Sequence, residues 1–213
     1  MVLTKQQIIN WLILIAKLMK ENEKYLTELD SAIGDADHGR NMTRGFGEVK
    51  RKLPTVSDKD IGTILKTSAM SLMLKSGGAC GQLYANFFVR SAAAVVAKEQ
   101  LEIDELLVML NAGLEGVYLR GRAIPGEKTM VDTLTPATVT LRDAIESNLE
   151  YLEALQLCVT AAEKGMKDTI PMQAKKGRAS YLGERSIGHQ DPGATSSYFI
   201  FKALYLAATG ETG

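Results

Sequence analysis

Three aspartates, Asp30, Asp35 and Asp37, lie within eight residues on a segment that also contains Gly34. Carboxylates held this close repel one another unless a multivalent cation or a shared proton offsets their charge. Oxygen-only ligands suit a hard cation such as Mg²⁺ or Ca²⁺, and the evenly spaced acidic loop and closing glutamate of an EF-hand are missing. Capping of a helix would account for one aspartate but not for three. The spacing therefore predicts a metal site.

The residues that follow, from His38 to Asn41, lead into a helical pattern. The start of a helix carries free backbone N–H groups, which would lie beside the metal in a favourable position for a phosphate. For His38 we favour the backbone N–H over the imidazole as the useful group. The acidic segment and the helix start together predict a site for a metal and a phosphate.

Most glycines collect in four segments, around residues 34–47, 77–81, 121–126 and 177–193. In an antiparallel helical domain alternate connectors share an end, so these segments can converge on one rim, where ligand sites are common. The segment 76–81 has three glycines in six residues. Glycine lets N–H groups approach an anion closely, but a tight turn between helices explains the segment equally well. It is not a P-loop, because the Gly-Lys-Ser/Thr ending is absent.

The segment 121–130 has the residue types of a phosphate contact but also those of a surface turn, which is the commoner structure. Arg122, Lys128 and Thr129 would offer donors to a phosphate, and Met130 would offer an adaptable apolar wall.

Residues 174–193 form the longest expected loop, and loops of this length are usually functional or disordered. Its apolar residues and arginines favour an ordered loop. Arg178 is the best candidate for a fork of donors to a phosphate. His189 is more often a loop anchor than a catalyst.

Composition limits the class of protein. The 213 residues predict a single domain over 1–213, with 46% apolar and 23% charged residues. Lys plus Arg and Asp plus Glu are both 25, so no net charge favours nucleic acid or a membrane surface. Cys80 and Cys158 are too few for a disulfide framework. Neither a signal peptide nor a membrane span fits the sequence, so we expect a cytoplasmic protein.

Helical periodicity recurs along the chain, and no stretch shows the sustained alternation of a strand. We therefore expect an all-α fold of about eight main helices. The first expected helix starts at a Thr4 cap, the second covers 39–53, and the third runs from an Asp58 cap until Gly77-Gly78 stops it. Further helices cover 82–98, 103–119, 134–147 and 150–168. A short helical piece lies near 170–176, and the last helix ends near Gly210.

The chain contains four distinctive motifs, at residues 34–39, 77–81, 125–130 and 177–195. They resemble the nucleotide-binding L subunit of dihydroxyacetone kinase, and the resemblance spans essentially the whole chain. It implies an antiparallel barrel of eight helices, with the nucleotide held by loops at one end.

The resemblance also implies roles for individual residues. Asp30, Asp35 and Asp37 would ligate Mg²⁺, which in turn binds the nucleotide phosphates. Cys80 departs from the serine found in many relatives, and because a thiol is a weaker donor than a hydroxyl, only its backbone contact carries over. The residues implied to contact ADP are His38, Gly39, Arg40, Asn41, Ala79, Cys80, Gly121, Met130, Arg178, Asp191, Pro192 and Gly193.

Two types of the family differ in their phosphoryl donor. In one, fused K and L domains consume ATP. In the other, a separate L subunit keeps ADP bound, and a phosphotransferase-system subunit rephosphorylates it from a phosphohistidine. The chain carries no K-type domain, so we expect a K-type partner that binds dihydroxyacetone. Its length and motifs favour the phosphotransferase-dependent type.

Charge indicates how the site would work. Two Mg²⁺ ions would change a ligand set of about −3 to about +1, which admits ADP or ATP. Phosphoryl transfer needs positioning and charge neutralisation, and no residue here is expected to act as a nucleophile or general base.

Three alternatives stay open. The chain could be the L subunit of an ATP-dependent kinase, or an ADP-sensing subunit that docks on a transcriptional regulator. It could also be a phosphocarrier that is phosphorylated on His38 or His189.

Overall fold

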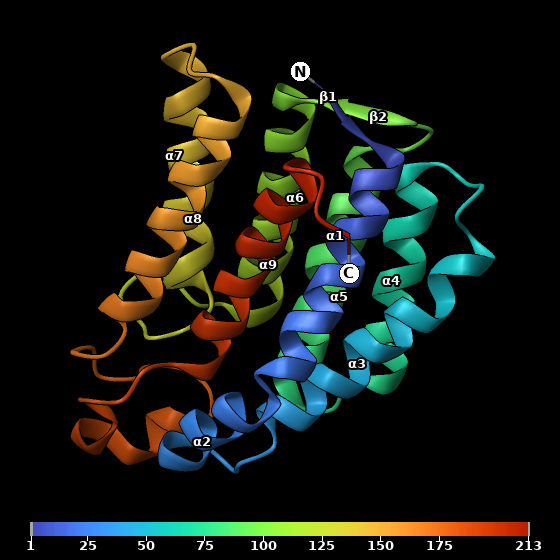
Figure 1. Cartoon of the computed structure of the whole chain (residues 1–213). Coiled ribbons are helices and arrows are strands. Elements are labelled where there is room, and N and C mark those ends of the chain that lie inside the picture. The colour runs from blue at the N-terminus through green and yellow to red at the C-terminus, as the bar shows by residue number, and fades with distance from the viewer. Residues whose placement is uncertain (1, 213) are drawn as a thin grey trace.

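The chain folds into a closed barrel of antiparallel helices, seen in a computed structural model that describes residues 2–212 (Figure 1). The helices of this range are α1 (Lys5–Glu21), α2 (Glu23–Ile33), α3 (His38–Lys52), α4 (Ile61–Lys75), α5 (Gly78–Ala94), α6 (Ile103–Gly121), α7 (Val131–Glu146), α8 (Tyr151–Asp168) and α9 (Pro192–Ala208). Two 3₁₀ segments, η1 (Leu53–Thr55) and η2 (Arg178–Ser186), and two strands, β1 (Val2–Thr4) and β2 (Gln100–Glu102), complete the described chain.

Eight of the helices form the barrel wall. Each of α1, α3, α4, α5, α6, α7, α8 and α9 packs against the next, and α9 packs against α1 to close the ring. Neighbouring helices run in opposite directions, so α3, α5, α7 and α9 all begin at the same end (Figure 1). Helix α2 lies across that end and contacts α3, α9 and η2. The expected all-α barrel of eight helices is confirmed.

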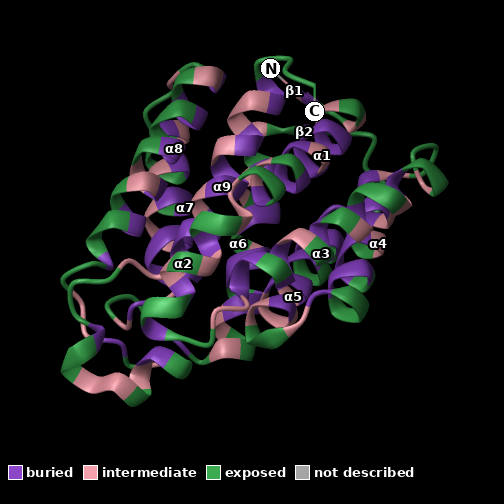
Figure 2. Cartoon of the chain, turned by 60° about the horizontal axis from the view of Figure 1, so that its bottom comes forward, coloured by how far each residue is buried: buried purple, intermediate pink, exposed green. Residues whose placement is uncertain are grey.

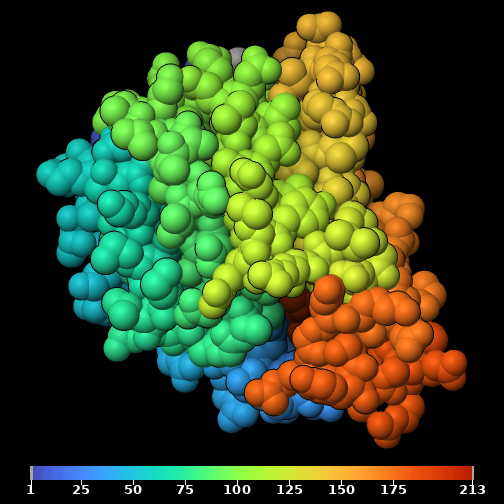
Figure 3. Space-filling model, turned by 180° about the vertical axis from the view of Figure 1, so that it is seen from behind, coloured from blue at the N-terminus to red at the C-terminus, as the bar shows by residue number. Residues whose placement is uncertain are grey.

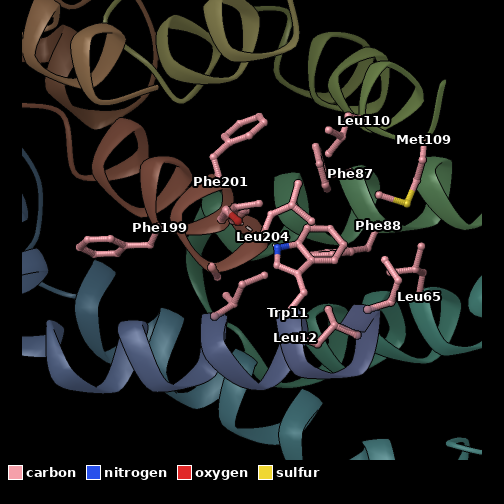
Figure 4. Packing of buried hydrophobic residues seen from close by; sticks show 14 of the residues in the cluster. Trp11, Leu12, Leu65, Phe87, Phe88, Met109, Leu110, Phe199, Phe201 and Leu204 are labelled. Carbon is pink, nitrogen blue, oxygen red and sulfur yellow. Dashed lines mark hydrogen bonds between the residues drawn. The ribbon is translucent and has the colours of Figure 1, made fainter. Parts of the chain in front are cut away.

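Apolar side chains from the wall fill the barrel. Buried residues occupy the inner faces of the helices and exposed residues the outer faces (Figure 2). Trp11 lies at the centre of a cluster with Leu65 and Phe88 (Figure 4). Its indole Nε1 donates to the carbonyl oxygen of Ile200 at 2.9 Å, which joins α1 to α9 where the ring closes. The core therefore supports a rigid wall.

Local signals set several helix ends as expected. Thr4 and Gln7 form the predicted capping box at the start of α1. Helix α4 corrects the prediction, because its cap is Asp60 and not Asp58. Asp60 Oδ1 accepts from the Thr63 N–H at 3.1 Å, whereas Asp58 points outward and pairs with Lys59.

Four further features of the fold differ from the prediction. Helix α2 was not expected, and neither was the antiparallel pair β1–β2, in which Leu3 faces Leu101. Helix α5 covers residues 78–94 instead of the expected 82–98, and Gly77 is its N-cap. Residues 170–176 form turns instead of a helix. The carbonyl oxygens of Ile170 and Met172 in this segment accept from the side chain of Lys128, as described below.

No helix between residues 2 and 212 combines the length and the apolar character that crossing a bilayer requires.

Candidate functional site

A cavity of about 560 Å³ opens at the end of the barrel where α3, α5, α7 and α9 begin. Seen from behind, a crevice separates the α6–α7 connection from the 169–191 segment (Figure 3). The glycine-bearing connectors all contribute to the lining, so their expected convergence is confirmed. The lining residues at the helix starts are His38, Asn41, Gly78, Ala79, Cys80, Met130, Val131, Asp191, Pro192 and Gly193.

Four helix N-termini therefore face one cavity. Each carries partial positive charge from the helix dipole and backbone N–H groups without partners in the helix. Helix α5 is the most open, because its N-cap Gly77 offers no side chain to its first N–H groups. Gly78, with φ of +69°, takes a left-handed backbone that favours glycine. This arrangement suits an anionic ligand such as a phosphate.

Three carboxylates stand at the edge of this cavity. Asp30, Asp35 and Asp37 each have a carboxylate oxygen that lies within 4.8 Å of such an oxygen of the other two. Asp30 comes from the last turn of α2, whereas Asp35 and Asp37 lie on the turn before α3. The unexpected helix α2 thus supplies one of the three predicted ligands.

Asp30 is held in a fixed orientation. Its Oδ2 accepts from the backbone N–H groups of Asp37 at 2.8 Å and His38 at 3.0 Å. Its Oδ1 needs the absence of a side chain at Gly34, where an added Cβ would lie 2.1 Å from it. The donor set fits a hard divalent cation, since it consists of oxygens only and repels itself without one.

Two contacts of His38 correct the prediction that its backbone N–H would be the group available to a phosphate. Its backbone N–H is not free for a phosphate, because Asp30 accepts it. Its imidazole Nε2 lies 3.0 Å from Ser196 Oγ, and Tyr84 Oη lies 2.7 Å from the same oxygen. Burial lowers the pKa of His38 to about 4, so the ring is neutral near pH 7. His38 thus joins the floor of the cavity to α5 and α9.

Burial also raises the pKa of two further groups of the cavity, Asp191 and Cys80. It raises the pKa of Asp191 to about 7, although Asp191 Oδ2 accepts from the Ala194 N–H and caps α9. It raises the pKa of the Cys80 thiol, and the nearby carboxylates add to the effect. Cys80 is therefore a protonated thiol at neutral pH and not a nucleophile.

The predicted contact residues fall into two groups. Gly121 and Arg178 line the cavity together with the helix-start residues named above. Gly39 and Arg40 do not line it. An added Cβ on Gly39 would meet the Glu23 carbonyl oxygen at 2.0 Å, so Gly39 lets α3 pack against α2. Arg40 donates to the Ala36 carbonyl oxygen at 3.0 Å on the outer face.

Of the three donors expected in 121–130, Thr129 lines the cavity, whereas Arg122 and Lys128 are placed differently. Arg122 is the left-handed C-cap of α6 and lies outside the cavity, and the Lys128 ammonium is bound to backbone carbonyls. Sequence reasoning missed several lining residues, because neither an apolar nor a polar residue near a helix end shows by its type alone that it faces a cavity. These are Ile33, Gln82, Leu83, Val117, Arg120, Ala123, Val131, Lys176 and Ala179.

The fold and the cavity define an all-α barrel domain with a carboxylate cluster and four helix N-termini at one end, an arrangement that suits a divalent cation and an anionic ligand. Residues 32–206 match the DAK2 domain. The chain therefore belongs to the DAK2 domain family of dihydroxyacetone kinase subunits, as its motifs predicted.

Two bacterial relatives match over almost their whole length. The Escherichia coli PEP-dependent dihydroxyacetone kinase, ADP-binding subunit DhaL, is 51% identical over 208 residues, which are 98% of this chain and 99% of that protein. The Lactococcus lactis PTS-dependent dihydroxyacetone kinase, ADP-binding subunit DhaL, is 43% identical over 204 residues, 95% of this chain and 97% of that protein.

A solved structure shares the fold. The dihydroxyacetone kinase from C. freundii, crystallised in complex with AMP-PNP and Mg²⁺, matches with a TM-score of 0.70 at 24% identity over 95% of this chain. The chain spans about a third of that kinase, since the match covers 33% of it.

Proposed function

We propose that this chain is the ADP-binding subunit of a phosphotransferase-system-dependent dihydroxyacetone kinase. It would hold Mg·ADP in the cavity and relay a phosphoryl group from a phosphohistidine to dihydroxyacetone on a K-type partner. The observation that carries the proposal is the meeting of three carboxylates and four helix N-termini at one cavity. Two relatives of matching length that are named ADP-binding subunits support it. The expected compartment is the cytosol.

Each part of the cavity has a task in this proposal. Asp30, Asp35 and Asp37 would hold the metal, which when bound supplies positive charge to the phosphates. The open first turn of α5 would donate N–H groups to the same phosphates. Met130 and the apolar residues beside it offer a wall for the base. We propose two Mg²⁺ ions, because a single ion leaves three carboxylates and a diphosphate with a large excess of negative charge.

The cavity offers positioning and not covalent chemistry. The neutral His38 ring lies beside Ser196, and burial keeps the Cys80 thiol protonated by raising its pKa. A general base for the triose hydroxyl would therefore belong to the partner that holds dihydroxyacetone. A regulatory partner stays a prediction, and a pull-down with and without Mg·ADP tests it.

The experiment is mass analysis of the purified protein under native and denaturing conditions. We expect one ADP and Mg²⁺ on the native chain, released on denaturation. Phosphate that remains on the denatured chain and is acid-labile would instead indicate a phosphocarrier on His189 or His38. An apo chain that fails to take up added Mg·ADP would contradict the proposal.

A further inference from the structure

Lys128 is a lysine in the interior of the site. Its residue is 1% exposed, and its backbone has a φ of +61°, the left-handed region that lysine rarely adopts. Both features cost free energy, because a buried ammonium loses its hydration and the backbone is strained. Contacts within the fold must therefore hold this residue in place.

The ammonium is surrounded by backbone carbonyl oxygens. Nζ donates to the Thr169 oxygen at 2.6 Å and to the Met172 oxygen at 3.1 Å, and it also donates to the His189 oxygen. The Ile170 oxygen lies farther away, at 3.4 Å. A ring of carbonyl oxygens at these distances is the environment that a protein offers to a dehydrated monovalent cation.

The carbonyls come from both ends of one segment. Thr169, Ile170 and Met172 directly follow α8, and His189 lies two residues before the Asp191 cap of α9. The Asp191 N–H donates to Thr169 Oγ1 at 3.1 Å, which closes the same junction. Lys128 thus binds both ends of the 169–191 segment and holds them close together.

This segment forms one wall of the cavity. Lys176, Gly177, Arg178 and Ala179 line it from within the segment, and Asp191 lines it from the far end. On the other side of Lys128, its chain neighbours Thr129 and Met130 also line the cavity. One ammonium therefore connects the α6–α7, α8–η2 and η2–α9 connections around a common ligand space.

We propose that Lys128 is a positioning residue of the nucleotide site. Its ammonium acts as a fixed internal cation that holds the two ends of residues 169–191 together, and so places Arg178 and Asp191 against the ligand. This inference rests on the proposed nucleotide function. It assigns Lys128 no contact with phosphate.

Two variants separate the charge from the space it occupies. Lys128→Met keeps most of the side-chain volume without the charge, whereas Lys128→Ala leaves a space lined by carbonyl oxygens. The matched control is Lys164→Met, because Lys164 is exposed on α8 and pairs with Asp168 at the surface. The measurements are the Kd of Mg·ADP by calorimetry and helicity by circular dichroism, in choline chloride and in ammonium chloride of equal ionic strength.

We expect both Lys128 variants to stay helical and to bind Mg·ADP at least about tenfold more weakly than wild type in choline chloride. Ammonium should restore much of the affinity of Lys128→Ala and leave Lys128→Met and Lys164→Met unchanged. A purely structural loss of side-chain volume would not respond to the identity of the salt cation.

Three results would overturn the proposal. The first is that Lys128→Met binds Mg·ADP with the wild-type Kd. The second is that Lys128→Ala binds Mg·ADP with the same Kd in ammonium chloride and in choline chloride. The third is that both variants lose helicity in every salt. The last result would mean that the lysine serves the fold and not the site. Failure of the proposed function is a separate outcome, because wild type itself would then not bind Mg·ADP.

Discussion

The guanidinium of Arg178 lies 3.0 Å from a carboxylate oxygen of Asp35, one of the three predicted metal ligands. The two residues come from different elements that line the cavity, Arg178 from η2 and Asp35 from the turn after α2. The pair joins the 169–191 segment to the carboxylate cluster, so cation binding at Asp35 and the position of η2 are physically linked. A divalent cation at Asp35 would weaken this attraction and leave the guanidinium available to a phosphate.

Replacement of Arg178 tests this link. Arg178→Ala should weaken Mg·ADP binding about tenfold, a loss of about 1.4 kcal/mol, because the phosphates lose a donor. The melting temperature without ligand should change little, since 69% of the Arg178 side chain is exposed and exposed ion pairs contribute only about 0–1 kcal/mol. Calorimetric binding and thermal unfolding measure the two effects. Arg142→Ala, at an exposed pair with Asp143, is the control. An unchanged Kd in Arg178→Ala would remove Arg178 from the site.

The three predicted metal ligands should all be needed for nucleotide binding, and one of them, Asp30, should also contribute to stability. Asp35→Ala, Asp37→Ala and Asp30→Ala should each abolish retention of Mg·ADP, because the phosphates then face the remaining carboxylates with less cation between them. Asp30→Ala alone should also lower stability without ligand by about 1–3 kcal/mol, since it leaves the N–H groups of Asp37 and His38 without their acceptor. Denaturant unfolding and mass analysis of bound ADP report the two losses. Asp58→Ala, outside the cavity, controls for the loss of a carboxylate. Tight ADP binding by Asp37→Ala in excess chelator would refute the metal assignment.

The sequence predicted the parts of the site that are local in the chain. Three aspartates within eight residues and the clustered glycines can be read directly from the sequence, whatever fold the chain adopts. Helical periodicity predicted the all-α fold, and the family resemblance implied the barrel. Helix α2 was missed because only Leu26, Asp30 and Ile33 are buried along it, which gives a weak apolar pattern. Contacts far apart in the chain left no signal, and the carbonyls around Lys128 are the clearest case, since every residue has a carbonyl.

Asp191 should make stability depend on pH. Burial raises its pKa to about 7 in the folded chain, so between its lower unfolded value and about pH 7 the folded state holds a proton that the unfolded state has released. The free energy of unfolding should therefore fall as pH rises through this window. Asp191→Asn stays neutral and keeps an oxygen for the Ala194 N–H. Relative to this variant, wild type should lose about 1–4 kcal/mol between pH 4 and pH 7. Guanidinium midpoints without Mg²⁺ or nucleotide measure the difference, and parallel pH curves for the two proteins would contradict the assignment.

The last prediction concerns the role of the bound nucleotide. The chain alone should not phosphorylate dihydroxyacetone, because a K-type partner is proposed to bind the triose. With that partner and a phosphohistidine donor, one equivalent of bound ADP should support many turnovers. The nucleotide would not need to leave, and release would require the carboxylate-bound cation and the helix N-termini to let go of it together. The assay supplies the K-type partner with either bulk ATP or the phosphotransferase donor and follows triose phosphate. Asp37→Ala in the same mixture is the inactive control. Rapid multiple turnover on bulk ATP without the donor would assign the chain to an ordinary ATP-dependent kinase, in which ADP leaves after each cycle.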